Sequence, residues 1–385
     1  MKRSLLQTSA ALWMALSLLH ITACSPTAIK PSLANLPDNA AALKAGTALL
    51  GHAVTEAELP KSDLYGLTPE LKTFAERATA TATSPLDKAL ALHKALITPQ
   101  SQGGRGFQFS ADTTELPAVT FARRQANCLS FSLLYVALAR HLQLEAFINQ
   151  VDIPPNWSMS GDTSMFFVVH INAMVKFPSE SRGLGAVDYV VVDLALNKYR
   201  PSYPQRALSP ELIEAQFYSN RGTEALANNQ FELAFLNLRK AIAADSQQSY
   251  VWNNLAIVYK RAGLLAEAEQ AYLKGLSYNH TDLTIMNNLA FLYEELNAPE
   301  KARYFSAQVK EYRNSNPYFE YSQALTKFGE GDASSALTHI QRAIAKESDV
   351  SRFYQLASTI HKTLNEPRNA QLMQQKYEKL AARGL

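Results

Sequence analysis

Alanine recurs every 34 residues through the second half of this 385-residue chain, at Ala234, Ala268, Ala302, Ala336 and Ala370. Five matches in one register are hard to reach by chance. A fixed period of this length is typical of repeat architectures, in which each repeat is one supersecondary unit that buries its apolar face only against its neighbours. The pattern therefore predicts a stack of similar helical units rather than one closed domain.

Other positions follow the same period. One repeat carries Trp252, Leu255, Ala256, Tyr259 and Gly263, and the next carries Met286, Leu289, Ala290 and Tyr293. Small residues let two helices cross closely while aromatic side chains fill the gap beside the crossing. The segment 214–383 thus resembles about five tetratricopeptide repeats, which implies an all-α solenoid with a concave face that binds a peptide or protein partner. Asn253 and Asn287, one period apart, are candidate peptide-binding residues, although asparagine can simply be frequent at this position.

The N-terminus has the pattern of an export signal. Lys2 and Arg3 precede an apolar stretch from residue 5 to 19, and Ile21-Thr22-Ala23-Cys24 resembles a bacterial lipobox. The resemblance implies that residues 1–23 are removed and that Cys24 receives acyl chains, which would hold the protein on a membrane, facing the periplasm. Ser25 favours the outer over the inner membrane. The alternative is an ordinary secretory signal with an incidental cysteine.

Composition narrows the class of partner. The formal net charge is 37 − 34 = +3 and falls to +1 when Lys2 and Arg3 are removed, which argues against nucleic acid. The sequence has no second apolar run of about 20 residues, so we expect a lipid-tethered chain rather than a spanning one. Residues 24–64, rich in Pro, Ala and Ser, are predicted to be a tether and linker with one short helix.

The region 65–205 has a mixed pattern that predicts an α+β domain. Thr68-Pro69 and Ser84-Pro85 are typical helix starts, and residues 129–144 are apolar nearly all round, as in a helix at the centre of a domain. Strand-like runs rich in Val, Phe and Ile follow at residues 146–151, 165–177 and 187–194.

Cys128 opens the apolar helix directly after Asn127, a favoured N-cap residue. If Cys24 carries lipid, Cys128 has no disulfide partner and is either inert or reactive. The positive end of the helix dipole and the nearby Arg123 and Arg124 favour a thiolate here. The pattern indicates a candidate nucleophile.

A nucleophilic thiol needs a base within hydrogen-bond reach. His141 lies about 20 Å along the same helix at 1.5 Å per residue, which excludes it, whereas His93 on a preceding helix stays open. His170 lies in the second strand-like run. If the last two runs pair around a loop at 178–186, opposite residues sum to about 2 × 182 = 364, and His170 and Asp193 sum to 363, which predicts that they face each other.

These residues resemble the bacterial transglutaminase-like branch of the papain-like cysteine enzymes. The match covers roughly 65–200 and includes Ala126-Asn127-Cys128-Leu129-Ser130-Phe131, Val169-His170-Ile171 and Val191-Val192-Asp193. The resemblance implies that Cys128 is the nucleophile, that His170 is the acid and base, and that Asp193 orients His170.

The backbone N–H of Cys128 would be one oxyanion donor, with Gln125 and Trp157 as candidates for the second. Ala126-Asn127 and Leu129 depart from the Gly and the aromatic residue that flank the cysteine in better-known members, so protein cross-linking and calcium dependence are not expected. The expected chemistry is hydrolysis or acyl transfer at an amide of a peptide or protein, with no metal and no cofactor.

Two alternatives stay open at this stage. One is a scaffold whose α+β domain binds without turnover and whose function lies in the repeats. The other is an arylamine-acyltransferase-like activity, which also uses Cys, His and Asp in this order.

Overall fold

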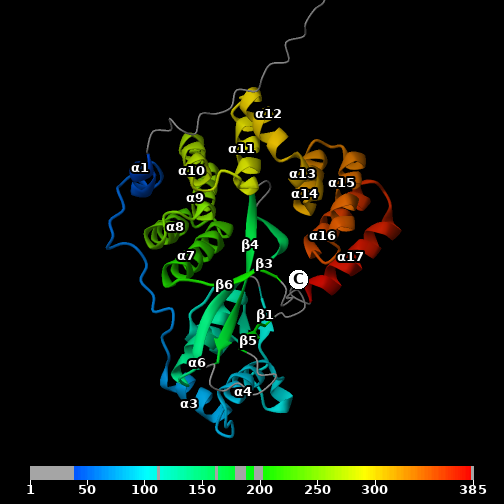
Figure 1. Ribbon diagram of the computed structural model, residues 1–385. Helices are drawn as coiled ribbons and strands as arrows, with labels where there is room; N and C mark the ends of the chain where they lie inside the picture. The colour runs from blue at the N-terminus through cyan, green and yellow to red at the C-terminus, as the bar shows by residue number, and fades with distance from the viewer. Residues whose placement is uncertain (1–38, 111–112, 161–163, 178–187, 195–202, 383–385) are drawn as a thin grey trace, which may run out of the picture.

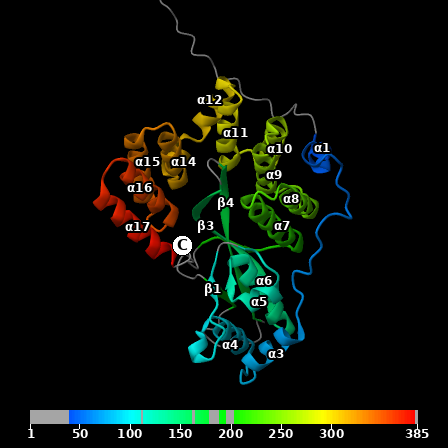
Figure 2. The ribbon, with the colours of Figure 1, turned by 180° about the vertical axis from the view of Figure 1, so that it is seen from behind.

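A single apolar helix, α6 (Cys128–His141), lies at the centre of the first half of the chain, and every side chain from Leu129 to Ala139 is buried. The computed structural model describes residues 39–110, 113–160, 164–177, 188–194 and 203–382, with side chains of 153–169 outside the description. An α+β domain in residues 65–207 is followed by a curved array of helices (Figures 1 and 2).

Short helices and a sheet cover α6 in the α+β domain. The helices are α3 (Pro69–Ala78), α4 (Pro85–Ile97), the 3-10 turn η2 (Gln100–Gln102) and α5 (Pro117–Arg123). The predicted helix starts are confirmed, because the hydroxyl oxygens of Thr68 and Ser84 accept hydrogen bonds from the N–H groups of Leu71 and Asp87. Each cap is followed by Pro at the first helical position, where its missing N–H costs no intrahelical bond.

The main sheet is antiparallel, with strand order β5-β4-β3-β6. Its strands are β3 (Glu145–Ser160), β4 (Ser164–Lys176), β5 (Tyr189–Val192) and β6 (Gln205–Ala207), and a separate parallel pair joins β1 (Gln108–Phe109) to β2 (Gln125–Ala126). Ile171, Ala173 and Val175 of β4 belong to the same core as α6, which packs against β3 and β4.

The strand β3 is longer than the sequence predicts, because it continues past Val151 to Ser160. Its pairing with β4 shifts between Val151 and Asn156, where Pro154 and Pro155 lack the N–H that a ladder requires. The two prolines end the apolar alternation from which the strand was predicted, and pairing with β4 resumes beyond them. The hairpin of β3 and β4 extends as an arm toward the helical array, where β4 contacts α9 and α11 and β3 contacts α14 (Figure 1).

Residues 210–382 form an all-α solenoid of antiparallel helix pairs, as the 34-residue period predicts. The pairs are α7 (Pro210–Ala227) with α8 (Phe231–Ala244), α9 (Ser249–Arg261) with α10 (Leu265–Tyr278), α11 (Leu283–Glu295) with α12 (Pro299–Gln308), α14 (Pro317–Gly329) with α15 (Ala333–Lys346), and α16 (Ser351–Thr363) with α17 (Pro367–Ala381), with the short α13 (Lys310–Ser315) before α14. The five periodic alanines all lie in the second helix of a pair, and all are buried. Burial of a small residue at each of these positions agrees with the close helix packing that the period predicts.

The turn inside each helix pair also repeats every 34 residues. One residue per turn has a left-handed backbone: Asn229 (φ 57°), Gly263 (φ 79°), Asn297 (φ 52°), Gly331 (φ 83°) and Asn365 (φ 59°). Glycine and asparagine are the residues that adopt this conformation at least cost. The five positions keep the 34-residue spacing of the alanines, so this period too is present in the sequence.

The segment 24–64 is not a simple tether, which corrects the sequence prediction for residues 39–64. The expected short helix exists as α1 (Ala40–Ala45), followed by α2 (Thr47–Leu50), and it packs against the repeats. Leu43 is buried, its carbonyl accepts the Tyr259 hydroxyl at 2.6 Å, and the Lys44 carbonyl accepts from Arg239 at 3.1 Å. The Pro, Ala and Ser content does not predict this packing, because the surface on which the segment packs lies more than 190 residues later in the chain.

The buried side chains do not divide at the predicted domain boundary near 205–214. One hydrophobic cluster runs from Leu43 through α6 and the sheet to Phe305, so it includes the first three helix pairs. A second cluster, from Tyr318 to Ile360, belongs to the last two pairs. The α+β domain and the first repeats therefore share one core.

Gly222→Ala is expected to destabilise the protein, although alanine is the better helix former. Gly222 lies inside α7, and an added Cβ would lie 2.7 Å from Cγ of Leu238 in α8. Overpacking of this kind costs about 1–3 kcal/mol, more than the gain of about 1 kcal/mol in helix propensity. The control is Gly329→Ala in α14, where the added Cβ would have no described atom within 4 Å apart from its chain neighbours and the backbone of its own helix. Urea denaturation should show a loss for the first variant and no loss for the second; equal effects would contradict the assigned crossing.

Candidate active site

Cys128 is the first residue of α6, as the sequence predicts. The side-chain oxygen of Asn127 accepts a hydrogen bond from the N–H of Ser130 at 2.8 Å and caps the helix. Arg124, with φ 57°, turns the chain out of α5 and into β2, which delivers Asn127 to the cap position. Cys128 itself is half-buried.

His170 and Asp193 complete a line of three side chains. The Sγ atom of Cys128 lies 3.9 Å from Nδ1 of His170, and Nε2 of His170 donates to Oδ2 of Asp193 at 2.5 Å. His170 and Asp193 are both buried. The bond to Asp193 leaves Nδ1 facing the sulfur, so the ring is oriented by the carboxylate.

The route by which Asp193 reaches His170 differs slightly from the sequence prediction. The strands β4 and β5 pair antiparallel, but Ala173 faces Val192, so opposite residues sum to 365, whereas about 364 is predicted and His170 and Asp193 sum to 363. Continuing that register, Asp193 lies opposite Asn172 and diagonal to His170, just beyond the end of β5. Diagonal neighbours on one face are close enough for long side chains to meet.

The two other histidines of the domain have different partners. His93 donates through Nε2 to the backbone carbonyl of Asp193 at 3.2 Å, so it supports the carboxylate residue and does not contact the thiol. Burial lowers the pKa of His93, which keeps its ring neutral. His141, at the far end of α6, bonds Glu76 at 2.9 Å on the surface.

The charge state of His170 reflects two opposing effects. Burial alone would lower its pKa, but hydrogen bonds with Asp193 and Cys128, together with their negative charges, outweigh burial and raise the pKa to about 10. The ring therefore carries a proton at neutral pH. An imidazolium between two acidic groups is the arrangement expected of a thiolate–imidazolium pair.

The three candidate oxyanion donors differ in how near they lie to the thiol and in how exposed they are. The N–H of Cys128 is at the first position of α6, where backbone N–H groups have no partner within the helix. Gln125 is exposed in β2, three residues before the cysteine. Trp157 lies in β3 opposite Phe167, but its side chain is not among those that the structure describes. Cys24, the candidate lipidation site, lies in residues 1–38, which are also outside the described residues.

The candidate peptide-binding residues of the repeats are buried and bonded to other protein groups. Asn253 accepts from Asn288 at 2.8 Å and donates to Asn254 at 3.1 Å, and Asn287 accepts from Nε of Arg313 at 2.8 Å. The strand β4 contacts α9 and α11, the two helices that carry them. The predicted exposed peptide contacts are therefore wrong for this structure, because both asparagines are buried.

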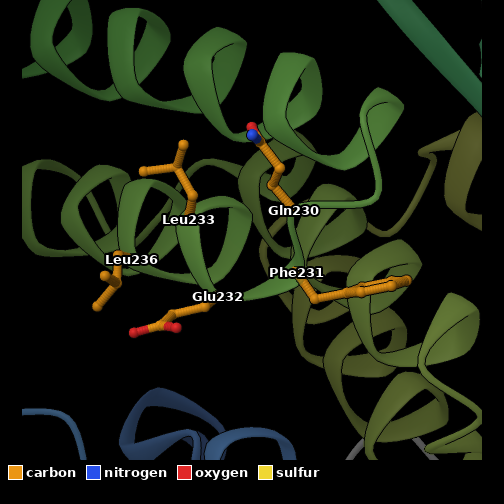
Figure 3. A pocket seen from close by; sticks show the side chains of 5 residues that line it. All are labelled: Gln230, Phe231, Glu232, Leu233 and Leu236. Carbon is orange, nitrogen blue, oxygen red and sulfur yellow. The ribbon is translucent and has the colours of Figure 1, made fainter.

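A surface depression on the solenoid is separate from Cys128, His170 and Asp193. It has a volume of about 390 Å³ and is lined by residues of α8 and of the turn before it: Gln230, Phe231, Glu232, Leu233 and Leu236 (Figure 3). Its lining includes neither a thiol nor an imidazole. Within the described ranges, no group of three His, Cys, Asp or Glu side chains could hold a metal ion, and no helix is long and apolar enough to cross a membrane.

Comparison with known proteins yields only distant structural similarity. No protein-family model matches the chain, and no curated protein matches it. Solved structures that align with it include YrrB, described as a TPR protein with an unusual peptide-binding site (17% identity, 43% of this chain and 86% of that chain, TM-score 0.26). MamA from Desulfovibrio magneticus RS-1 aligns at 14% identity over 46% of this chain and 98% of that chain (TM-score 0.29). The Cut9–Hcn1 hetero-tetramer of APC/C aligns at 17% identity over 45% and 34% (TM-score 0.34). These scores are too low to add weight, so the assignment of a tetratricopeptide-type solenoid rests on the helix pairs and their period.

His170 is expected to titrate near pH 10 rather than near its ordinary 6.5. Because the pKa is raised in the folded state, the stabilisation from its protonated form is present below about pH 6.5 and is lost as the pH rises through about 10. Imidazole ¹⁵N NMR of the folded protein measures the midpoint. Asp193→Ala should lower it, since burial remains while the hydrogen bond is lost. A wild-type midpoint at or below 6.5 would contradict the assigned pair.

Proposed function

We propose that the protein is a thiol hydrolase or acyl transferase that acts on an amide of a peptide or protein. The observation that carries the proposal is the line from Cys128 through His170 to Asp193, with the thiol at a helix N-terminus and the imidazole between it and a buried carboxylate. A protonated His170 beside the sulfur of a half-buried cysteine is the ground state that thiol acyl transfer needs.

The chemistry follows from the placement of the protons. The Cys128 thiolate attacks the carbonyl carbon of the amide, and the negative charge that develops on oxygen faces the N–H of Cys128. His170 gives its Nδ1 proton to the leaving nitrogen, the C–N bond breaks, and a thioester forms on the sulfur. Neutral His170 then takes a proton from water or from an acceptor amine, which attacks the thioester and restores the Cys128–His170 pair. Asp193 holds the ring orientation throughout.

Water as the acceptor gives hydrolysis, and an amine gives transfer. The helical solenoid would recruit the protein substrate or a partner, the role that such arrays commonly play. Asn253 and Asn287 would take part only if the hairpin arm left the helices that it contacts, because both side chains are buried.

A catalytically inactive scaffold is the second candidate function, and the solenoid itself is the observation that favours it. The two functions separate in a complementation experiment. Cys128→Ala should fail to rescue a deletion strain, at normal protein abundance, if the protein is an enzyme, and should rescue fully if it is a scaffold.

The thiol should react faster than an ordinary cysteine, and the excess should depend on His170. General acid–base partners contribute about 10²–10⁴ in rate, and we expect at least about a tenfold loss of Cys128 alkylation by iodoacetamide at pH 7 in His170→Ala. His141→Ala is the matched control, because His141 lies at the opposite end of the same helix in a surface pair with Glu76. If Cys128 is alkylated no faster than free cysteine, and at the same rate in His170→Ala, the proposal is wrong.

We also propose that Cys24 carries lipid and holds the protein on a bacterial membrane, facing the periplasm, with Ser25 favouring the outer membrane. The support is the charged, apolar and small-residue order of residues 1–24. In a bacterial host fed a clickable palmitate analogue, the chain should take up label, and Cys24→Ala should lose it. Cys128→Ala, the other cysteine variant, should keep it. Label that persists in Cys24→Ala would overturn the assignment.

A further inference from the structure

One buried threonine joins the helical solenoid to the candidate active site. The N–H of Thr114 donates to Oε1 of Glu224 at 2.6 Å, and its carbonyl accepts from Nη1 of Arg221 at 3.2 Å. Glu224 and Arg221 both lie on α7, the first helix of the repeats. The backbone of Thr114 is therefore held at both polar groups by the array, and Thr114 is 0% exposed.

The side chain of Thr114 extends the contact to the nucleophile. Its Oγ1 accepts from Nδ2 of Asn127 at 2.7 Å, while Oδ1 of the same Asn127 caps α6 at Ser130. Asn127 directly precedes Cys128. Because the amide of Asn127 is bonded at both its oxygen and its nitrogen, its orientation depends on where Thr114 lies.

Glu115, the next residue, makes a second connection between α7 and the first turn of α6. The N–H of Glu115 donates to Oγ of Ser130 at 2.9 Å, and the Glu115 carboxylate pairs with Arg123 at 2.7 Å and with Arg221 at 3.5 Å. Arg221 thus contacts both Thr114 and Glu115. The first turn of α6 is tied to the loop before α5, and that loop is tied to α7.

The carboxylate of Glu224 is held where solvation is poor. Burial raises the pKa of Glu224 to about 7, against the hydrogen bonds of Thr114 and the charge of Arg221, which lower it. Burial of a carboxylate costs free energy unless hydrogen bonds or opposite charges compensate it, and here Thr114 and Arg221 supply both.

We propose that Glu224 and Arg221 are positioning residues for Cys128, acting through Thr114 and the Asn127 cap to hold the sulfur beside His170. This inference rests on the proposed thiol chemistry and extends it, because it makes the first repeat helix part of the catalytic unit. Without the Glu224 contact the loop can shift, Asn127 loses its fixed acceptor, and the first turn of α6 frays, which moves Sγ away from Nδ1. The shared hydrophobic core of the α+β domain and the first repeats agrees with this role.

The test measures Cys128 alkylation by iodoacetamide against pH in the full chain. Glu224→Ala should slow alkylation at pH 7 at least about fivefold, comparable with the loss of an N-cap contact, and should move the pH profile toward that of a free thiol. Glu224→Gln should stay within about twofold of wild type, because its amide oxygen still accepts from Thr114. Rescue by the conservative variant separates positioning from general stability.

Glu214→Ala is the matched control. Glu214 is on the same helix and forms a 2.8 Å ion pair with Lys240 of α8, so its loss removes a charge and a contact from α7 without touching Thr114. Thr114→Val removes only the Oγ1 acceptor at nearly constant volume and should shift the profile in the same direction as Glu224→Ala. If Glu224→Ala does not fold, Thr114→Val still tests the contact between Thr114 and Asn127.

The outcomes are distinguishable from failure of the thiol chemistry itself. If wild type and His170→Ala alkylate alike, the proposed function fails. If they differ, but Glu224→Ala and Thr114→Val keep the wild-type profile or Glu214→Ala falls equally, only the positioning role is overturned.

Discussion

The apolar helix α6 is the constraint on which the α+β half depends. A helix that is apolar on every side is stable only when other elements cover it completely, and α3, α4, α5, β3 and β4 all contact it. Only the two ends of α6 are accessible: Cys128 at its start is half-buried, and Arg140 near its end is exposed. Cys128 lies where the first N–H groups have no partner within the helix.

The helical array depends instead on the close packing of the two helices within each pair. Alanine at a 34-residue spacing lets each pair of helices approach, and Asn or Gly at the same spacing reverses the chain between them. Both signals are local, so both are legible in the sequence. The alanine period is sufficient to predict the solenoid, and the Asn and Gly period locates each turn within a helix pair.

The contacts between the two halves are long-range, and they change the meaning of several residues. Their position in the period predicts Asn253 and Asn287 as peptide contacts, but their helices contact β4 and both side chains are buried. The composition around Leu43 predicts a tether, yet Leu43 packs on the repeats. Thr114 and Glu224 had no sequence signal at all, because 110 residues separate two groups that share one short hydrogen bond.

The sequence by itself determined the repeat period, the start of α6 at Cys128 and the three candidate catalytic residues, since helix caps, apolar periodicity and residue order are local properties. Only the tertiary structure decided the diagonal contact of Asp193 with His170, the supporting role of His93 and the docking of residues 39–64. Each of these depends on register or on packing between distant segments. A shift of one or two residues in a strand changes such partners without changing any local pattern.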